Sequence, residues 1–321
     1  MILPPALQRG DKVAIISPSG VIAPERVEGA VSALRQWGLS PVVGAHALEQ
    51  AVSYGAIVTG GTIAHRLADL QWALCDPSVK CILCSRGGYG AVHLLEHLDW
   101  QLIRNHPKWL IGFSDISALH AAWHRAGVMS VHASMAKHFT DFGVDGDVSE
   151  ALYRILTRQR VDYRVPALSA GSVVRLSAGT ASGVLLGGNL AVLAGLVGTP
   201  FNLFKPGAIL LLEDMGEEIY RVERMMYQLR LSGVLQHLAG LVVGRFTRYH
   251  ADGQWLESSE DDTRHRMYSM ISDMVSPYDY PVAYGFPMGH VDDNVPLLLG
   301  ARATLSVTSA EVTLRLYFPG E

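Results

Sequence analysis

Ser114 lies where an apolar stretch changes into a helical pattern, which is a position typical of a catalytic nucleophile. The stretch 109–111 passes through a Gly-Phe pair to Ser114 and then into a segment with helical spacing. A serine at such a turn is exposed at the edge of a sheet, and backbone N–H groups at the start of the helix can stabilise an oxyanion. The G-x-S-x-G pattern of many hydrolases is incomplete here, because Ile116 occupies its last position. Ser114 could therefore be a nucleophile or only the cap of the helix.

A serine nucleophile needs a base, and the base needs an acid that orients it. Glu213 directly follows the strongly apolar stretch 208–212, where a carboxylate at the end of a strand can be partly buried and held. His290 lies in a turn rich in glycine and proline, which predicts a rigid loop. The chain has thirteen histidines, and spacing alone does not select this one. Other acids could take the place of Glu213, namely Asp214, Glu217, Glu218, Asp292 and Asp293.

A glycine-rich turn, Ser85 to Gly90, follows another apolar stretch. Because glycine lacks a Cβ, this backbone could approach a ligand closely. The turn lacks both the Lys-Ser/Thr pair of a P-loop and the G-x-G-x-x-G spacing, so it could be an oxyanion donor as well as a phosphate-binding turn. A second glycine segment, VTGGTIA at 58–64, is similar to the threonine-nucleophile signature of asparaginases. Since it lies far from the first predicted strand and has no T-D-T partner, we interpret it as a loop that caps the next helix.

The elements that must position these residues alternate between strands and helices in the first half of the sequence. Such alternation is typical of βαβ units, and predicts an α/β fold with a parallel sheet and helices on both faces. Ligands bind at the carboxyl ends of such strands, so Arg86, the glycines after it and Ser114 should share one edge. We expect strands at 12–17, 41–43, 81–84 and 109–112, and helices at 24–38, 65–75, 89–98 and 116–126.

The pattern changes after about residue 150, where a stretch rich in Val, Arg, Ser and Gly enters β structure. We therefore predict an α/β nucleophile domain over 1–155, a linker over 156–180, and a smaller β-rich domain over 181–321. In the second domain we expect strands at 208–212, 241–244, 303–307 and 312–317, the last two antiparallel, with a helix at 220–231.

The composition predicts a folded protein without an obvious polyanionic partner. Of the 321 residues, 49% are hydrophobic, which argues against disorder. The net charge of −4 gives no electrostatic reason to expect nucleic acid or an anionic membrane as a partner. No secretory signal is visible, and the apolar stretch 183–204 contains many glycines and reads as a buried strand-turn-helix rather than a membrane span. We therefore expect a soluble, cytoplasmic protein.

The three cysteines, Cys75, Cys81 and Cys84, lie close together in the sequence. Their odd number and their clustering argue against a disulfide framework. Cys81 and Cys84 lie on a predicted strand, and no second pair of matching spacing is present to complete a metal site. We expect buried, unreactive thiols.

Seven motifs follow one another along the chain: IISPSG, GT with R-x-x-D-L, SRGGYG, IGFSD, GGNL with GTPF, LLED-x-x-E with YRVERM, and GFPMGH. In this order they resemble the LD-carboxypeptidase family, which includes murein tetrapeptide carboxypeptidases and microcin C self-immunity peptidases. The resemblance implies that Ser114 is the nucleophile, that His290 is the general base and that Glu213 orients it. It also implies an oxyanion hole formed by the backbone N–H of Asp115 with that of Gly87 or Gly88.

The resemblance further implies hydrolysis of the bond between the L-centre of a diamino acid and the terminal D-alanine of murein tetrapeptide. The reaction would pass through an acyl-enzyme and require no metal or cofactor, and members of the family commonly form homodimers. Arg86 and Arg224 could bind carboxylates of the peptide, because a guanidinium suits bidentate pairing. For Arg224, its place in a charged helix beside Glu223 favours a structural salt bridge over substrate binding.

Two other functions compete with this one. Microcin C immunity peptidases cleave aminoacyl or peptidyl sulfamoyl-adenylates and usually stack the adenine on a tryptophan just before the GGN motif. This chain has Leu186 there, which favours the murein peptide. A non-catalytic peptide-binding protein on the same scaffold is the third hypothesis, although all three triad positions hold competent residues.

Overall fold

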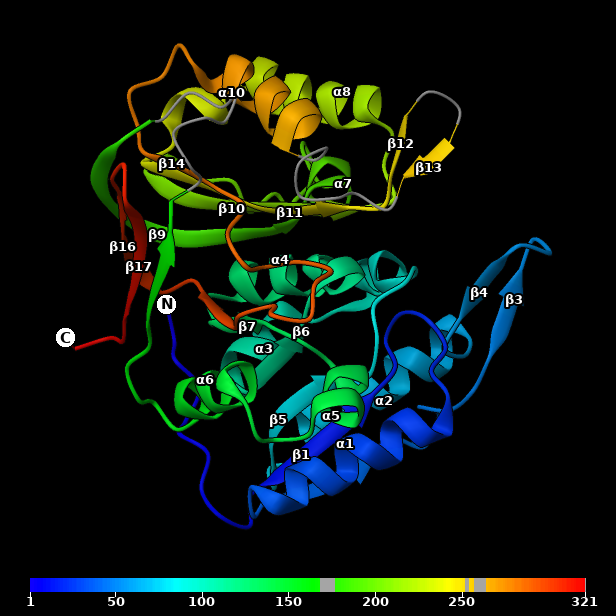
Figure 1. Cartoon of the computed structure of the whole chain (residues 1–321). Helices are drawn as coiled ribbons and strands as arrows, with labels where there is room; N and C mark the ends of the chain where they lie inside the picture. Colours follow the sequence, from blue (N-terminus) through cyan, green and yellow to red (C-terminus); the bar gives the residue numbers. More distant parts are fainter. Residues whose placement is uncertain (168–176, 252–253, 257–263, 321) are drawn as a thin grey trace. The chain divides into compact units, whose positions relative to one another are not determined.

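The computed structural model describes residues 1–167, 177–251, 254–256 and 264–320. The chain divides into two compact units (Figure 1). Unit 1 consists of Met1–Arg160 with Val295–Gly300, and unit 2 consists of Val161–Asn294 with Ala301–Glu321. Unit 2 begins within the segment 156–180 that the sequence predicts as a linker, and residues 295–300 group with unit 1.

The sheet of unit 1 is parallel except at one edge. Its strand order is β15-β7-β6-β5-β1-β2. The five parallel strands are β1 (Lys12–Ile16), β2 (Ser40–Val43), β5 (Val79–Cys84), β6 (Trp109–Gly112) and β7 (Ser130–His132). The edge strand β15 (Leu297–Leu299) pairs antiparallel with β7. The predicted α/β fold is confirmed, and the antiparallel edge strand, which comes from the far end of the sequence, was not predicted.

The order of the strands determines which face of the sheet each crossover helix of unit 1 covers. β2 lies on one side of β1, whereas β5, β6 and β7 follow on the other side, so right-handed crossovers place α1 on one face and the crossover helices α2, α3 and α4 on the opposite face. Accordingly α1 contacts α5, while α2, α3 and α4 contact one another in series (Figure 1). Their bounds are α1 Pro24–Gln36, α2 Ile63–Cys75, α3 Trp100–Asn105, α4 Ser117–Ala126, α5 Ala136–Phe142 and α6 Asp147–Leu156.

Two local features of unit 1 bear on later arguments. The helix predicted at 89–98 is instead the 3-10 helix η1 (Ala91–His97), whose buried Ala91 and Leu94 lie three residues apart, as that helix requires. Between β2 and α2, the strands β3 (Ala51–Ser53) and β4 (Ile57–Thr59) form an antiparallel hairpin that extends away from the sheet (Figure 1).

The sheet of unit 2 joins a parallel half to an antiparallel half. Its order is β14-β11-β10-β9-β16-β17-β8. The parallel strands are β9 (Gly179–Asn189), β10 (Ala208–Met215), β11 (Gly240–Thr247) and β14 (Val282–Tyr284). The antiparallel strands are β16 (Arg302–Val307), β17 (Glu311–Tyr317) and β8 (Asp162–Pro166). The long strand β9 belongs to both halves, because 179–184 pair with β16 and 184–189 with β10.

The remaining elements of unit 2 are its helices and one small pair of strands. They are the helices α7 (Leu190–Gly195), α8 (Ile219–Leu231) and α10 (Ser269–Val275), the 3-10 helix η3 (Leu235–His237), the π-helical turn η4 (Arg264–Tyr268), and the small β12 (Tyr249–Ala251) and β13 (Gln254–Leu256) pair. The stretch 183–204 contains the end of β9 and α7, as the predicted strand-turn-helix requires. In the described part of the chain, no helix has both the length and the apolar character needed to cross a bilayer.

The cysteines are free thiols. Cys81 and Cys84 lie on β5 and are buried, as predicted, and burial raises the pKa of both thiols. Cys75 differs from the prediction, because it ends α2 and is exposed.

Candidate active site

Ser114 occupies a strained turn between β6 and α4. The chain leaves β6 through the extended Phe113, and Ser114 then has a φ of 61° and begins the short 3-10 helix η2 (Ser114–Ile116). A positive φ at a residue with a side chain costs about 1–3 kcal/mol and is found mainly at functional sites. The helix-cap alternative does not fit, because Phe113 precedes η2 and Ile116 precedes α4. A strained turn from strand to helix is also where hydrolases of the G-x-S-x-G type carry their nucleophile.

Ile116, where the chain departs from the G-x-S-x-G pattern, packs against Gly112. A Cβ at Gly112 would lie 2.9 Å from Cγ2 of Ile116 and 3.0 Å from its Cβ. Ile116 therefore covers the backbone of Gly112, and the first glycine of the pattern is needed even though the last one is replaced.

Two glycine loops of unit 1 meet beside Ser114. They follow β1 and β5, the neighbouring strands at which the strand order reverses, and ligands of parallel sheets bind at such a point. The N–H of Gly20 donates to the carbonyl oxygen of Gly87 over 2.9 Å, and the hydroxyls of Ser17 and Ser85 lie 2.6 Å apart. A Cβ at Gly87 would lie 2.9 Å from the Cβ of Ser114. The SRGGYG turn and Ser114 therefore share one edge of the sheet, as predicted.

The side chain of Asp115 ties three of the loops at this edge together. Its Oδ2 accepts from the hydroxyl of Ser19 at 2.5 Å and from the N–H of Ala91 at 2.8 Å. Burial raises the pKa of this carboxyl, although both hydrogen bonds and the charge of Arg66 oppose the shift. Sequence reasoning used only the backbone N–H of Asp115 and missed this second role. The acid directly after Ser114 in the IGFSD motif was the available signal.

Arg66 is a second residue that the sequence reasoning did not assign to the site. It is buried, and its Nη1 donates to the carbonyl oxygens of Pro18 and Gly90, each over 2.7 Å. Those carbonyls belong to the loops after β1 and β5. The R-x-x-D-L motif therefore supplies an internal brace for the loops beside Ser114.

In unit 2, Glu213 and His290 form a hydrogen-bonded pair. Nδ1 of His290 lies 2.9 Å from Oε2 of Glu213. The side chain of Glu213 is fully buried, whereas that of His290 is 18% exposed. In the described part of the chain, the other oxygen of Glu213, Oε1, has no hydrogen-bond partner. Among the described residues, the imidazole of His290 is thus the hydrogen-bond partner of this carboxylate.

A bulge and a glycine turn bring this pair together. The pairing of β10 with β11 shifts register at Glu213, so that Gly244 and Arg245 together lie opposite this one residue. Such bulges redirect side chains near active sites. The N–H of Arg245 donates to the carbonyl oxygen of Met288 over 2.9 Å, which holds the His290 loop against the bulge. The loop is also anchored where the N–H of Gly289 donates to Oδ1 of the buried Asn294.

The electrostatics of the pair favour a protonated imidazole. Burial lowers the pKa of His290, but the charge and the hydrogen bond of Glu213, with the charge of Asp214, outweigh it, so the pKa is raised overall. A buried carboxylate on Nδ1 fixes the orientation of the ring and stabilises the imidazolium, as in serine-protease triads. The other ring nitrogen, Nε2, would then be the one that exchanges protons.

The competing acids have other partners or positions. Asp214 accepts hydrogen bonds from Nδ2 of Asn189 and from the N–H groups of Ala191 and Met215, over 2.8–2.9 Å. Burial, and next the charge of Glu213, raise the pKa of Asp214 to about 7. Glu218 pairs with Arg221 at 3.2 Å, and the pKa of Glu217 is raised by burial. Asp292 and Asp293 are exposed beside the His290 loop.

The two predicted substrate-binding arginines are both exposed. Arg86 belongs to unit 1, where its Nη1 donates to the carbonyl oxygen of Val21 over 3.0 Å. Arg224 belongs to unit 2, and its guanidinium lies 5.3 Å over the ring of Tyr220. Arg224 thus contacts an aromatic ring on its own helix.

The comparisons with known proteins cover both units. The family pattern described as the LD-carboxypeptidase N-terminal domain matches residues 13–133, and the C-terminal domain pattern matches residues 182–305. A Streptomyces coelicolor protein that carries a carboxypeptidase name is 36% identical over 319 residues, which are 98% of this chain and 96% of that protein. The murein tetrapeptide carboxypeptidase of Pseudomonas aeruginosa is 32% identical over 302 residues, covering 92% of each chain.

A solved structure agrees with these sequence relatives. The crystal structure of muramoyltetrapeptide carboxypeptidase from Oxalobacter formigenes has a TM-score of 0.80 and 27% identity, and it covers 96% of this chain and 99% of that chain. The strained Ser114 turn lies within the matched N-terminal domain, and Glu213 and His290 lie within the matched C-terminal domain. The chain therefore belongs to the LD-carboxypeptidase family of peptidases.

Proposed function

We propose that this protein is a serine LD-carboxypeptidase that removes the terminal D-alanine from murein tetrapeptide. Ser114 is the nucleophile, His290 the general base and Glu213 the acid that orients it. The observation that carries the proposal is the 2.9 Å hydrogen bond between Nδ1 of His290 and the buried Oε2 of Glu213. A buried carboxylate that is hydrogen-bonded to Nδ1 suits an imidazole that transfers protons. Because the chain belongs to a peptidase family, the reaction that we propose for this imidazole is peptide hydrolysis.

In the first half of the proposed reaction, Nε2 of His290 accepts the proton of Ser114 as Oγ attacks the carbonyl carbon before D-alanine. Glu213 stabilises the resulting imidazolium. The N–H of Asp115, with that of Gly87 or Gly88, donates to the oxyanion of the tetrahedral intermediate. The close approach of Gly87 to Ser114 supports this assignment.

In the second half, the C–N bond breaks and the imidazolium donates its proton to the amine of D-alanine, which leaves as the free amino acid. Water then attacks the acyl-enzyme while His290 accepts one of its protons, and Ser114 is regenerated. The proposal requires that Oγ of Ser114, from unit 1, meet Nε2 of His290, from unit 2, in the active enzyme.

Two observations support the choice of substrate: the exposed arginines, and the absence of an aromatic residue at position 186. Arg86 and Arg224 are exposed guanidinium groups, which suit the carboxylates of an anionic peptide. Leu186 is buried on β9, paired in register with Leu210, so this position offers no aromatic face for an adenine. We therefore favour the murein peptide over a sulfamoyl-adenylate. Cytoplasmic murein recycling and a homodimeric state belong to the same proposal.

The decisive experiment is mass spectrometry of the products after incubation with murein tetrapeptide and, separately, with an aminoacyl sulfamoyl-adenylate. We expect D-alanine release by the wild type and a loss of about 10⁴-fold or more in Ser114→Ala. Ser32→Ala, on the exposed face of α1, is the matched control and should retain activity. Cleavage of the adenylate alone would overturn the substrate assignment. Retention of activity in Ser114→Ala would overturn the serine mechanism.

A further inference from the structure

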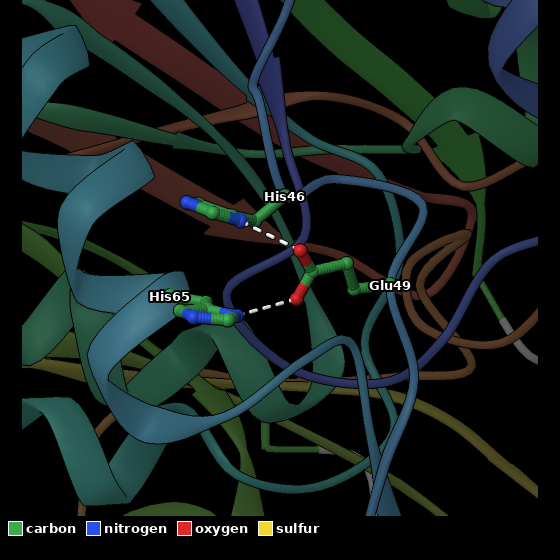
Figure 2. Close-up of side chains that lie close together, drawn as sticks. All are labelled: His46, Glu49 and His65. Carbon is green, nitrogen blue, oxygen red and sulfur yellow. Dashed lines mark hydrogen bonds and ion pairs between the residues drawn. The ribbon is translucent and has the colours of Figure 1, made fainter.

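Three potential metal ligands gather in unit 1, outside the residues assigned to hydrolysis. His46 and Glu49 lie in the turn after β2, and His65 lies in the first turn of α2. Nδ1 of His46 is 2.7 Å from Oε1 of Glu49, and Nδ1 of His65 is 2.5 Å from Oε2. Figure 2 shows both imidazoles on the same side of the carboxylate, each directing one nitrogen toward it.

The arrangement is compact enough for one ion. The two rings are stacked with centroids 4.2 Å apart, and the ligand atoms of the three residues lie within 4.8 Å of one another. Ligands of a tetrahedral Zn²⁺ ion stand about 3.3 Å apart, given metal–ligand distances near 2.0–2.1 Å. An ion could therefore replace the two hydrogen bonds with small movements of the three side chains. In the described part of the chain, no other group of histidine, cysteine and acidic residues meets this spacing.

The backbone around the cluster is already organised. The N–H of His46 donates to both oxygens of Asp69, over 3.3 and 3.0 Å, and the N–H of Glu49 donates to the carbonyl oxygen of His46 over 3.0 Å. Thr62 caps α2 by accepting from the N–H of His65. The predicted role of the VTGGTIA loop as a helix cap is thereby confirmed. Each ligand thus comes from a backbone segment held by its own hydrogen bonds.

Gly61, in the VTGGTIA loop, leaves space beside Glu49 and His65. A Cβ at Gly61 would lie 3.3 Å from Oε2 of Glu49 and 3.6 Å from the Cβ of His65. Gly61 also has a φ of +98°, which residues with side chains rarely adopt. The two ligands therefore pack against a bare backbone, which leaves them room to converge.

The charges around the cluster suit a dication. Two carboxylates are present at the cluster: Glu49 itself, and Asp69, which accepts from the N–H of His46. The side chains of His46, Glu49 and His65 are 29%, 40% and 44% exposed, which gives an ion direct access from water.

We propose that His46, Glu49 and His65 bind one divalent transition-metal ion of the zinc type, with water completing its coordination. Two imidazoles and one carboxylate are a ligand set that zinc uses with an open position, and imidazole also suits Co²⁺ and Ni²⁺. The ion takes no part in the hydrolysis and does not depend on the assignment of Ser114, Glu213 and His290.

The role of the ion follows from where its ligands lie along the chain. Glu49 precedes the β3–β4 hairpin and His65 follows it, so the ion closes the base of that hairpin. The hairpin leads into Gly60, whose N–H donates to the carbonyl oxygen of Ser19 over 2.8 Å, and the hydroxyl of Ser19 bonds Asp115 beside the nucleophile. Metal binding therefore stabilises the segment that supports the Ser114 edge of unit 1.

The test is isothermal titration calorimetry, in which ZnCl₂ is added to the full-length, untagged, metal-free protein near neutral pH. We expect one high-affinity site per chain, and at least a tenfold loss of affinity in His65→Gln and in Glu49→Gln, because even residues that only support ligands cost about 10–100-fold. The matched control is His97→Gln. Its side chain is also 44% exposed and has a carboxylate at 3.6 Å, but it is a single imidazole.

Two further measurements keep the test decisive. Saturating Zn²⁺ should raise the Tm of the wild type and of His97→Gln but not of His65→Gln, since only a site in the native state stabilises by mass action. The Tm of each variant without metal shows whether it folds. Absence of stoichiometric binding in the wild type would overturn the proposal. Equal binding by all four proteins would do the same, because it would mean adventitious zinc on surface histidines.

Discussion

The backbone of Gly289 lies directly against the buried carboxylate of Glu213. A Cβ at position 289 would be 2.8 Å from Oε2 and 3.0 Å from the Cβ of Glu213. Gly289 also has a φ of +110°, which disfavours any side chain. The loop that carries His290 can therefore approach Glu213 only because residue 289 is glycine.

Gly289→Ala is expected to displace Glu213 or the His290 loop and to lower kcat/KM for D-alanine release by about 10²-fold, because a misplacement of about 1 Å has that cost. Gly207→Ala is the control: its φ is +75°, but nothing lies within 4 Å of a Cβ there. Steady-state kinetics of both variants make the comparison. An equal loss in the two would assign the effect to backbone strain and not to contact with Glu213.

Glu213→Gln should lower kcat by about 10⁴-fold, because a neutral amide on Nδ1 neither fixes the tautomer of His290 nor stabilises its imidazolium. Asp214→Asn should lower it by less than about tenfold, since the Asp214 oxygens bond Asn189 and two backbone N–H groups rather than His290. Single-turnover kinetics on murein tetrapeptide would rank the two variants. The reverse ranking would identify Asp214 as the orienting acid.

The raised pKa of His290 predicts that kcat/KM declines on the acid side with a midpoint above 6.5, the ordinary value, because only the neutral imidazole can act as the base. Glu213→Gln should move this midpoint to lower pH in its residual activity. The same shift makes the ion pair contribute stability below about pH 6.5, and this contribution is lost as the pH rises through the raised pKa. An unchanged midpoint in Glu213→Gln would contradict the coupling of the two residues.

The free energy of unfolding of Ser114→Gly should exceed that of Ser114→Ala by about 1 kcal/mol, because glycine accepts the φ of 61° without strain. The glycine variant should therefore unfold at a higher denaturant concentration. Both variants lack Oγ and should be inactive, so the comparison isolates the backbone. Urea unfolding of the two proteins at one pH measures the difference. If the alanine variant is at least as stable as the glycine variant, the Ser114 turn is not strained.

Local patterns in the sequence were sufficient for most of the elements that carry the site. The strand at Trp109–Gly112 was predicted with its bounds, and the helix Ile219–Leu231 to within one residue. The prediction failed at 89–98, where the chain forms a shorter 3-10 helix, Ala91–His97, whose first N–H donates to the Asp115 carboxylate. The spacing of apolar residues did not distinguish this helix from an α-helix.

The relationships across the chain could not be derived from spacing. Glu213 and His290 are 77 positions apart, and their pairing depends on a bulge in the sheet and on the turn at Gly289. The order of the motifs suggested these two residues, whereas the local sequence features left several acids as candidates for the residue that orients His290. The cluster of His46, Glu49 and His65 escaped notice for the same reason, because a hairpin separates its members in the sequence.

The edge strand β15 determines when unit 1 can be completed during synthesis. Its residues, Leu297–Leu299, pair with β7, although the rest of the unit has already been translated by Arg160. Until the ribosome has passed residue 300, β7 lacks this neighbour and has an unpaired edge, and such edges recruit other chains. A fragment that ends at Arg160 would keep that edge open, so the sheet of unit 1 is completed only when nearly the whole polypeptide has been made.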